Sequence, residues 1–188
     1  MALVVDSIKC VEESDEIGSD LVYLVVFQGR TSVPFASAVK VVWRGSLWEF
    51  DTGNEDNWDV RAASTNADAM YAVMMVEEDY TPDFLTSDVR LAWHEKTDYI
   101  WKKLMLENLG QGIPTNNTAV KSLGFSRIRD ALLELASEWA DWAPGSTDDV
   151  IQVKRVTITS SGQSQTLRFR SEDEDATYDV TFKQTNDP

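Results

Sequence analysis

Carboxylate side chains gather where apolar runs of this chain begin or end. Some precede the run 21–27, others follow the run 72–76, and the rest precede the run 150–153; they are Glu13, Asp15, Glu16, Asp20, Glu77, Asp79, Asp83, Asp148 and Asp149. A hard cation such as calcium takes several oxygen ligands, carboxylates among them, in flexible geometry. The pattern therefore predicts a calcium site built from loops, with these residues as the candidate metal ligands.

Two explanations of the acidic loops compete. A cluster of carboxylates without compensation repels itself strongly at low effective dielectric, so either a cation or full solvation must relieve it. In the second case the loops are ordinary polar turns. An EF-hand loop is excluded, because Ile17 stands where the fifth-position ligand belongs and Leu24 where the terminal Glu belongs.

Two aromatic residues are candidate ligand-binding groups. Trp58 lies within the polar loop 51–59, and Tyr80 follows an acidic turn. An exposed flat ring in either place would stack on a sugar, and with calcium beside it the site would be lectin-like. The alternative for Trp58 is that its ring packs against the body of the protein.

The sequence contains few candidate residues for catalysis. His94 is the only histidine, and no Gly-x-Ser-x-Gly motif accompanies it. The run from His94 to Asp98 resembles a zinc-binding helix but ends in Asp where the second His belongs. Carboxylates of the turn 77–79 could serve glycoside hydrolysis, which makes a hydrolase the third hypothesis. We expect a protein that is not an enzyme.

Apolar periodicity predicts the elements that must position these groups. Short apolar runs rich in β-branched residues indicate strands, and a 3.6-residue period indicates helices. The expected strands are 3–11, 21–27, 38–43, 46–50, 70–76, 150–159, 166–170 and 177–182, and the expected helices are 87–108 and 126–142. This order predicts a mainly β (α+β) fold: one domain, 1–188, in which 1–84 and 148–188 form an antiparallel β-sandwich around a helical insertion, 85–147.

Three local features refine this expectation. The run 21–27 is nearly all apolar, which predicts a strand buried on both faces, and Gly29 is expected in the turn that follows. The second helix is expected to begin at Ser126 as N-cap. Its apolar stripe comprises Ile128, Ala131, Leu132, Leu135, Trp139 and Trp142.

The placement of the acidic residues resembles the C2-type calcium-binding sandwich. The likeness rests on Asp15 and Asp20 near the first turn, on 77–79 and Asp83 after a central strand, and on 148–149 before a late strand. It leaves out 87–143, and the paired Asp-x-Asp of that family is replaced by Glu-x-Asp at 77–79. The resemblance implies calcium-gated docking to a membrane or a protein.

Charge and cysteine content exclude several classes of function. The net charge of −15 repels phosphate backbones, which excludes nucleic acid as a partner, and it disfavours anionic lipid until cations neutralise the loops. Cys10 is the only cysteine and is expected to be buried, so neither an intramolecular disulfide nor a zinc site of several thiolates can form.

The N-terminus lacks the basic segment and apolar core of a signal peptide, and no apolar run is long enough to cross a bilayer. We therefore expect a cytoplasmic protein, or one released without a cleaved signal, that is not transmembrane. The expected function is binding: docking to a membrane, glycan or protein partner, as in a toxin-like protein. The alternative is a structural subunit of a viral, phage or other homo-oligomer.

Overall fold

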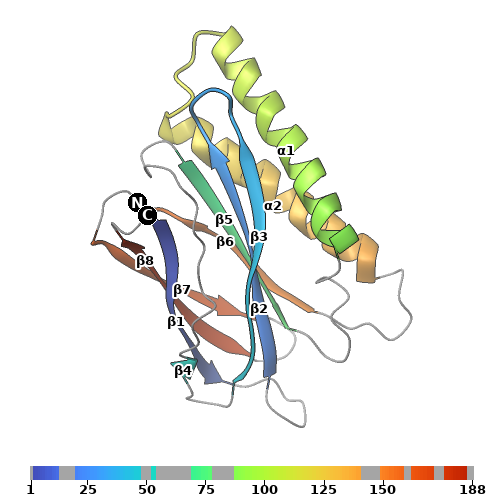
Figure 1. Ribbon diagram of the computed structural model, residues 1–188, viewed down its shortest axis with the longest axis vertical. Helices are drawn as coiled ribbons and strands as arrows, with labels where there is room; N and C mark the ends of the chain where they lie inside the picture. The colour runs from blue at the N-terminus through green and yellow to red at the C-terminus, as the bar shows by residue number, and fades with distance from the viewer. Residues whose placement is uncertain are drawn as a thin grey trace.

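Two antiparallel sheets face each other, and two helices cover the outer side of one of them (Figure 1). The structure is a computed structural model, and it describes residues 2–12, 20–47, 52–53, 69–77, 87–140, 149–158, 162–171 and 176–185. The first four-stranded sheet contains, in spatial order, β4 (Thr52–Gly53), β1 (Ala2–Glu12), β8 (Thr177–Thr185) and β7 (Ser164–Arg170). The second contains β3 (Ser37–Leu47), β2 (Asp20–Arg30), β5 (Ala69–Glu77) and β6 (Asp149–Val156).

The helices α1 (Ser87–Gly110) and α2 (Thr118–Ala140) follow β5 and precede β6 in the chain. They form a third layer against the second sheet, α1 over β3 and α2 over β5 and β6. The predicted fold class is thereby confirmed: a mainly β, antiparallel sandwich with a two-helix insertion between its early and late strands.

The second sheet is buried on both faces because two cores meet on it. Side chains of β2 alternate between them: Val22, Leu24 and Val26 face the first sheet, whereas Tyr23 and Phe27 face the helices. Every residue of β5 is buried as well. Continuous apolar runs are what a strand between two layers requires, and the predicted burial of 21–27 on both faces is confirmed within the described side chains.

The open edge between the two sheets is closed by side chains that bond to the backbone opposite. The Lys154 ammonium donates to the Arg168 carbonyl, and the Arg170 amide donates to the Gln152 side-chain oxygen at 3.2 Å. Such bonds use backbone groups of β7 that an unpaired edge strand would leave open to another chain.

The structure corrects the prediction of two strands at 38–43 and 46–50. β3 continues through Arg44 and Gly45 to Leu47, and 48–50 lie outside the described residues. The pairing with β2 passes from Arg44 to Val42 and skips Trp43. A β-bulge of this kind absorbs one extra residue while the strand continues, so the Gly that resembled a break does not end the strand.

Two further expectations were wrong. Gly29 does not lie in a turn, because β2 runs on to Arg30, and Gly29 itself is paired with Ser37 of β3 and with Met70 of β5. α2 begins at Thr118, more than two turns before Ser126, whose hydroxyl instead donates to the Ser122 carbonyl at 3.2 Å. The capping group is Asn117, whose side-chain oxygen accepts the Ala119 amide at 2.8 Å.

Candidate cation site at one end of the sandwich

Three of the predicted metal ligands lie within the described part of the chain: Asp20, Glu77 and Asp149. The other residues predicted to bind metal or ligand lie outside it, namely Glu13, Asp15, Glu16, Asp79, Asp83, Asp148, Trp58 and Tyr80. What the structure describes is therefore the set of strand ends from which the predicted loops depart.

Strand pairing brings these three residues to the same end of one sheet. Glu77, the last residue of β5, is paired with Val22 of β2 on one side and with Asp149 of β6 on the other. Asp20, the first residue of β2, lies two residues before Val22. The predicted acidic segments therefore leave or enter the sheet at neighbouring strand ends (Figure 1).

The other sheet reaches this end too. β1 ends at Glu12 and β2 begins at Asp20, so the segment between them joins the two sheets here. Glu12 is also paired with Thr177, the first residue of β8. We call this end of the molecule, defined by Glu12, Asp20, Glu77 and Asp149, the acidic end.

Glu77 differs from an ordinary turn residue because its side chain is buried. It is only 3% exposed, as the final member of a strand that is buried throughout. Its oxygen chemistry and its place beside the backbone of Asp149 fit a hard cation.

Within the described residues, no three side chains of His, Cys, Asp or Glu lie close enough together to hold a metal ion. The described part of the acidic end could supply some oxygen ligands. A complete ligand set would have to include residues of the adjoining loops.

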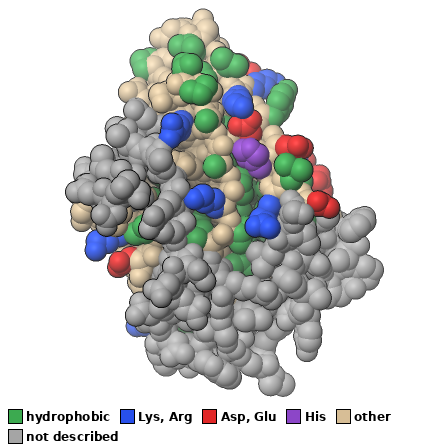
Figure 2. Space-filling model, viewed as in Figure 1, with side chains coloured by type: hydrophobic (Ala, Val, Ile, Leu, Met, Phe, Trp, Pro, Cys, Tyr) green, Lys and Arg blue, Asp and Glu red, His purple; other side chains and the backbone are tan. Residues whose placement is uncertain are grey.

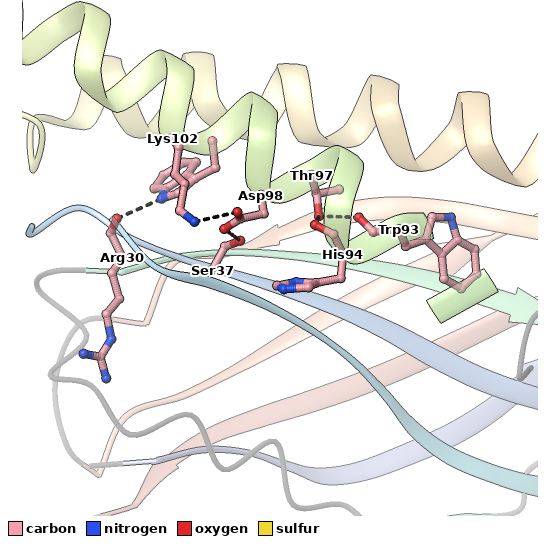
Figure 3. Close-up of polar contacts among 8 residues, drawn as sticks. Arg30, Ser37, Trp93, His94, Thr97, Asp98 and Lys102 are labelled. Carbon is pink, nitrogen blue, oxygen red and sulfur yellow. Dashed lines mark hydrogen bonds and ion pairs between the residues drawn. The ribbon is translucent and has the colours of Figure 1, made fainter. Parts of the chain in front are cut away.

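A second polar group, not foreseen from the sequence, joins α1 to the strands beneath it (Figure 3). The Asp98 carboxylate accepts a hydrogen bond from the Ser37 hydroxyl at 2.8 Å and is paired with the Lys102 ammonium at 2.7 Å. The Trp101 indole N–H donates to the Arg30 carbonyl at 2.8 Å. Contacts between β3 and α1 join residues 61 positions apart, which spacing alone does not reveal.

The polar surroundings of Asp98 alter its acidity. Burial raises the pKa of its carboxyl, but the hydrogen bonds from Lys102 and Ser37 and the positive charge of Lys102 outweigh it, so the net pKa is lowered. His94 lies one turn away (Figure 3), and its Nδ1 is buried without a hydrogen bond to any described residue. Since Ser37 donates to Asp98, these groups do not form the Ser–His pair of a hydrolase.

Two grooves lie on the helical side of the molecule, and neither is lined by Asp20, Glu77 or Asp149. One, of about 300 Å³, runs between α1 and α2 and is lined by Tyr99, Ile100, Lys103, Arg127, Asp130 and Glu134. The other, of about 360 Å³, lies where the β2–β3 turn meets the α1–α2 loop, and its lining includes Thr31, Leu109, Ile113 and Pro114. Each groove combines distant segments, so sequence patterns give no sign of it.

Neither described helix has the length and apolar character needed to cross a bilayer. Comparisons with known proteins found no matching family model, no matching curated protein and no matching solved structure.

Proposed function

We propose that this protein is a non-enzymatic binding module whose acidic end binds a hard cation such as calcium and then docks to a membrane, glycan or protein partner. One observation supports the proposal: pairing of Glu77 with both Val22 and Asp149 sets the ends of β2, β5 and β6, which adjoin the predicted acidic segments, side by side at one end of the sheet. If the acidic segments were ordinary polar turns, there would be no reason for the strand ends beside them to be neighbours.

The net charge explains why docking would depend on the cation. At −15 the chain repels anionic lipid head groups and acidic glycans alike. A bound cation removes that repulsion locally and offers open coordination positions to anionic oxygens of the partner. This is the behaviour that the resemblance to C2-type sandwiches implies.

Calorimetric titration with calcium, together with thermal unfolding with calcium or with a chelator, tests the cation site. A ligand that binds only the folded state at about 100 times its Kd stabilises it by about 2.7 kcal/mol. For a chain of this size that gain corresponds to a rise in Tm of about 5–10 °C. We expect Glu77→Gln and Asp149→Asn each to reduce the calcium-dependent rise.

Glu107→Gln is the matched control. It removes one carboxylate near the far end of α1, where Glu107 pairs with Arg127 at 3.6 Å, and leaves the acidic end intact. The calcium response of this variant should equal that of the parent chain. Loss of the response in all three variants, or no response in the parent chain, would mean that the loops are ordinary turns.

Docking itself is tested separately, by co-sedimentation with vesicles of phosphatidylserine and with immobilised acidic glycans. Binding should require calcium and should be reversed by a chelator. If calcium stabilises the protein but neither surface retains it, the cation site stands and a protein partner becomes the docking target.

A further inference from the structure

The outer surface of α1 carries a row of apolar side chains that no described element covers. Leu91, Tyr99, Leu106 and Leu109 are 53%, 66%, 59% and 51% exposed. In Figure 2, hydrophobic, acidic and basic side chains follow one another along the flank of the molecule that α1 occupies in Figure 1. A surface of this mixed kind is typical of contacts between helices.

Helical geometry aligns these side chains. Steps of three or four residues return to the same side of an α-helix. The exposed residues that follow such steps, which we call the outer stripe of α1, are Asp88, Leu91, Glu95, Tyr99, Lys102, Leu106 and Leu109. Val89, Trp93 and Trp101 lie on the opposite side of the helix and are buried.

The outer stripe has a symmetric order. Leu91 and Leu106 lie equally far from the midpoint between Asp98 and Tyr99, and so do Glu95 and Lys102, which carry opposite charges. The outermost pair about this midpoint is Asp88 with Leu109. Tyr99 stands next to that midpoint. Reversing the direction of the helix therefore exchanges leucine for leucine and places acid where the base had been.

From this order we infer that α1 pairs with α1 of a second copy of this chain, antiparallel about a two-fold axis near Tyr99. In this arrangement Leu91 faces Leu106 of the partner subunit and Glu95 faces Lys102 of the partner subunit. A two-fold interface requires that each such contact occur twice, once in each direction. The antiparallel order satisfies that requirement for the leucines and for the charges together.

The charges of the outer stripe favour an antiparallel second copy over a parallel copy or a lipid surface. A parallel pair would set Glu95 against Glu95 of the partner subunit, which like-charge repulsion disfavours. Glu95 forms no ion pair with any described residue of its own chain, and Lys102, which pairs with Asp98, keeps ammonium protons for a second acceptor. A lipid surface fits less well, because both charges lie in the middle of the stripe.

The overall charge of −15 on each copy opposes association at low ionic strength. At physiological ionic strength screening acts beyond about 8 Å, so this long-range repulsion falls while the close contacts between Glu95 and Lys102 of the partner subunit persist. The inference goes beyond the proposed cation-dependent docking and does not depend on it.

Sedimentation equilibrium of the full chain, from about 1 µM to about 1 mM, measures the association. We expect a reversible dimer, and Leu106→Glu should weaken it by about tenfold or more. Glu95→Lys and Lys102→Glu should each weaken it as well, whereas the double exchange should return the affinity to within about threefold of the parent chain. Leu133→Glu, at an exposed leucine of α2, is the control and should leave the dimer intact.

A chain that stays monomeric over this range would overturn the inference. So would a dimer that Leu106→Glu leaves intact, or one in which the double charge exchange fails to restore affinity. Circular dichroism of each variant shows that it is folded, which is expected because all of the changed side chains are exposed.

Cysteine cross-linking tests the orientation independently. Tyr99→Cys places two thiols near the proposed axis, whereas Leu109→Cys places them about 30 Å apart along the direction of the helices, from a rise of 1.5 Å per residue. A disulfide needs Cα atoms within about 7 Å. Native Cys10 is buried and does not compete. Oxidation should cross-link Tyr99→Cys and spare Leu109→Cys; cross-linking of both, of neither, or of Leu109→Cys alone would overturn the antiparallel pair.

Discussion

The indole of Trp101 lies against the backbone of Gly29, in the place that a β-carbon at that residue would occupy. The same ring contacts Gly124 on α2, where an added β-carbon would lie 2.5 Å from Cζ3 of Trp101. Phe27 meets the ring edge-on, with centroids 5.8 Å apart. One tryptophan on α1 thus joins the strand β2 to the second helix, and two glycines create the space for it.

Gly29→Ala and Gly124→Ala should each destabilise the fold. An added methyl group must displace a ring that is fully buried, and overpacking of this kind costs about 1–3 kcal/mol. Urea unfolding measures the loss as a lower midpoint at unchanged slope.

Gly110→Ala is the control for this pair, because a β-carbon at Gly110 would have no heavy atom within 4 Å. Its midpoint should be close to that of the parent chain. If Gly29→Ala were as stable as Gly110→Ala, then the contact with Trp101 would not be a tight one.

Gly29 also illustrates what sequence patterns miss. In the sequence Gly29 resembles a turn residue. In the structure it lies within a strand, where the absence of a side chain lets the indole of Trp101, far along the sequence, approach the backbone closely. Periodicity did predict β2, β5 and α1 well, because those segments have long apolar patterns. It could not foresee which helix packs where, since the pattern carries no information on partners.

The candidate cation site was predictable in part for a related reason. Acidic residues beside strand ends could be found from spacing, and the strand order then placed Glu77 between β2 and β6. The outer stripe of α1, in contrast, could not be predicted from the sequence. Tyr99 is an aromatic residue of that helix, yet it is 66% exposed, whereas Val89, Trp93 and Trp101 on the opposite side are buried.

Asp98 should make the free energy of unfolding depend on pH under acidic conditions. Burial alone would raise its pKa, but Lys102 and Ser37 stabilise the carboxylate more strongly, so its pKa in the folded state lies below the ordinary value for aspartate. The ionised carboxylate of Asp98 therefore stabilises the fold above about pH 4, and this stabilisation is lost as the pH falls through the lowered pKa. Asp98→Asn should cost about 1 kcal/mol at neutral pH, a value reduced by partial exposure, and the difference should shrink on acidification.

Urea unfolding at several pH values measures this difference, with Asp130→Asn, a change at an exposed side chain, as the control. A constant gap between Asp98→Asn and the parent chain from pH 7 down to about pH 2 would show that the charge of Asp98 contributes nothing.

Arg168 and Asp179 form a second, independent ion pair, across β7 and β8. Two hydrogen bonds join them, from Nε to Oδ1 at 2.8 Å and from Nη2 to Oδ2 at 2.7 Å. These bonds are the main cause that lowers the pKa of Asp179; burial opposes them, and the charges of Arg168, Lys9 and Arg170 add to the lowering. Because the lowered pKa belongs to an acid, the pair stabilises the fold at neutral pH and the contribution disappears on acidification.

Carboxyl NMR titration should place the pKa of Asp179 below 3.8 in the parent chain and should move it upward in Arg168→Gln. Arg129→Gln removes an equally exposed guanidinium on α2 and should leave the titration of Asp179 unchanged. An unchanged pKa in Arg168→Gln would show that the pair is not formed in solution.

The structure and the sequence-based prediction place the start of α2 at different residues. Asn117 caps the helix with its side chain, and its carbonyl accepts the Lys121 amide at 3.0 Å, the first bond of the helix. Asn117→Ala should therefore cost about 1 kcal/mol in the free energy of unfolding. Ser126→Ala should cost less, because Ser126 lies inside the helix, where its hydroxyl bonds to the preceding turn.

Asn116→Ala completes the comparison, since it makes the same change one residue earlier at an exposed side chain. Measured together by urea unfolding, Asn117→Ala should be the least stable of the three variants. If Ser126→Ala were the least stable, the helix would begin at Ser126 in solution. The two turns before it, which include Gly124, would then not pack against Trp101.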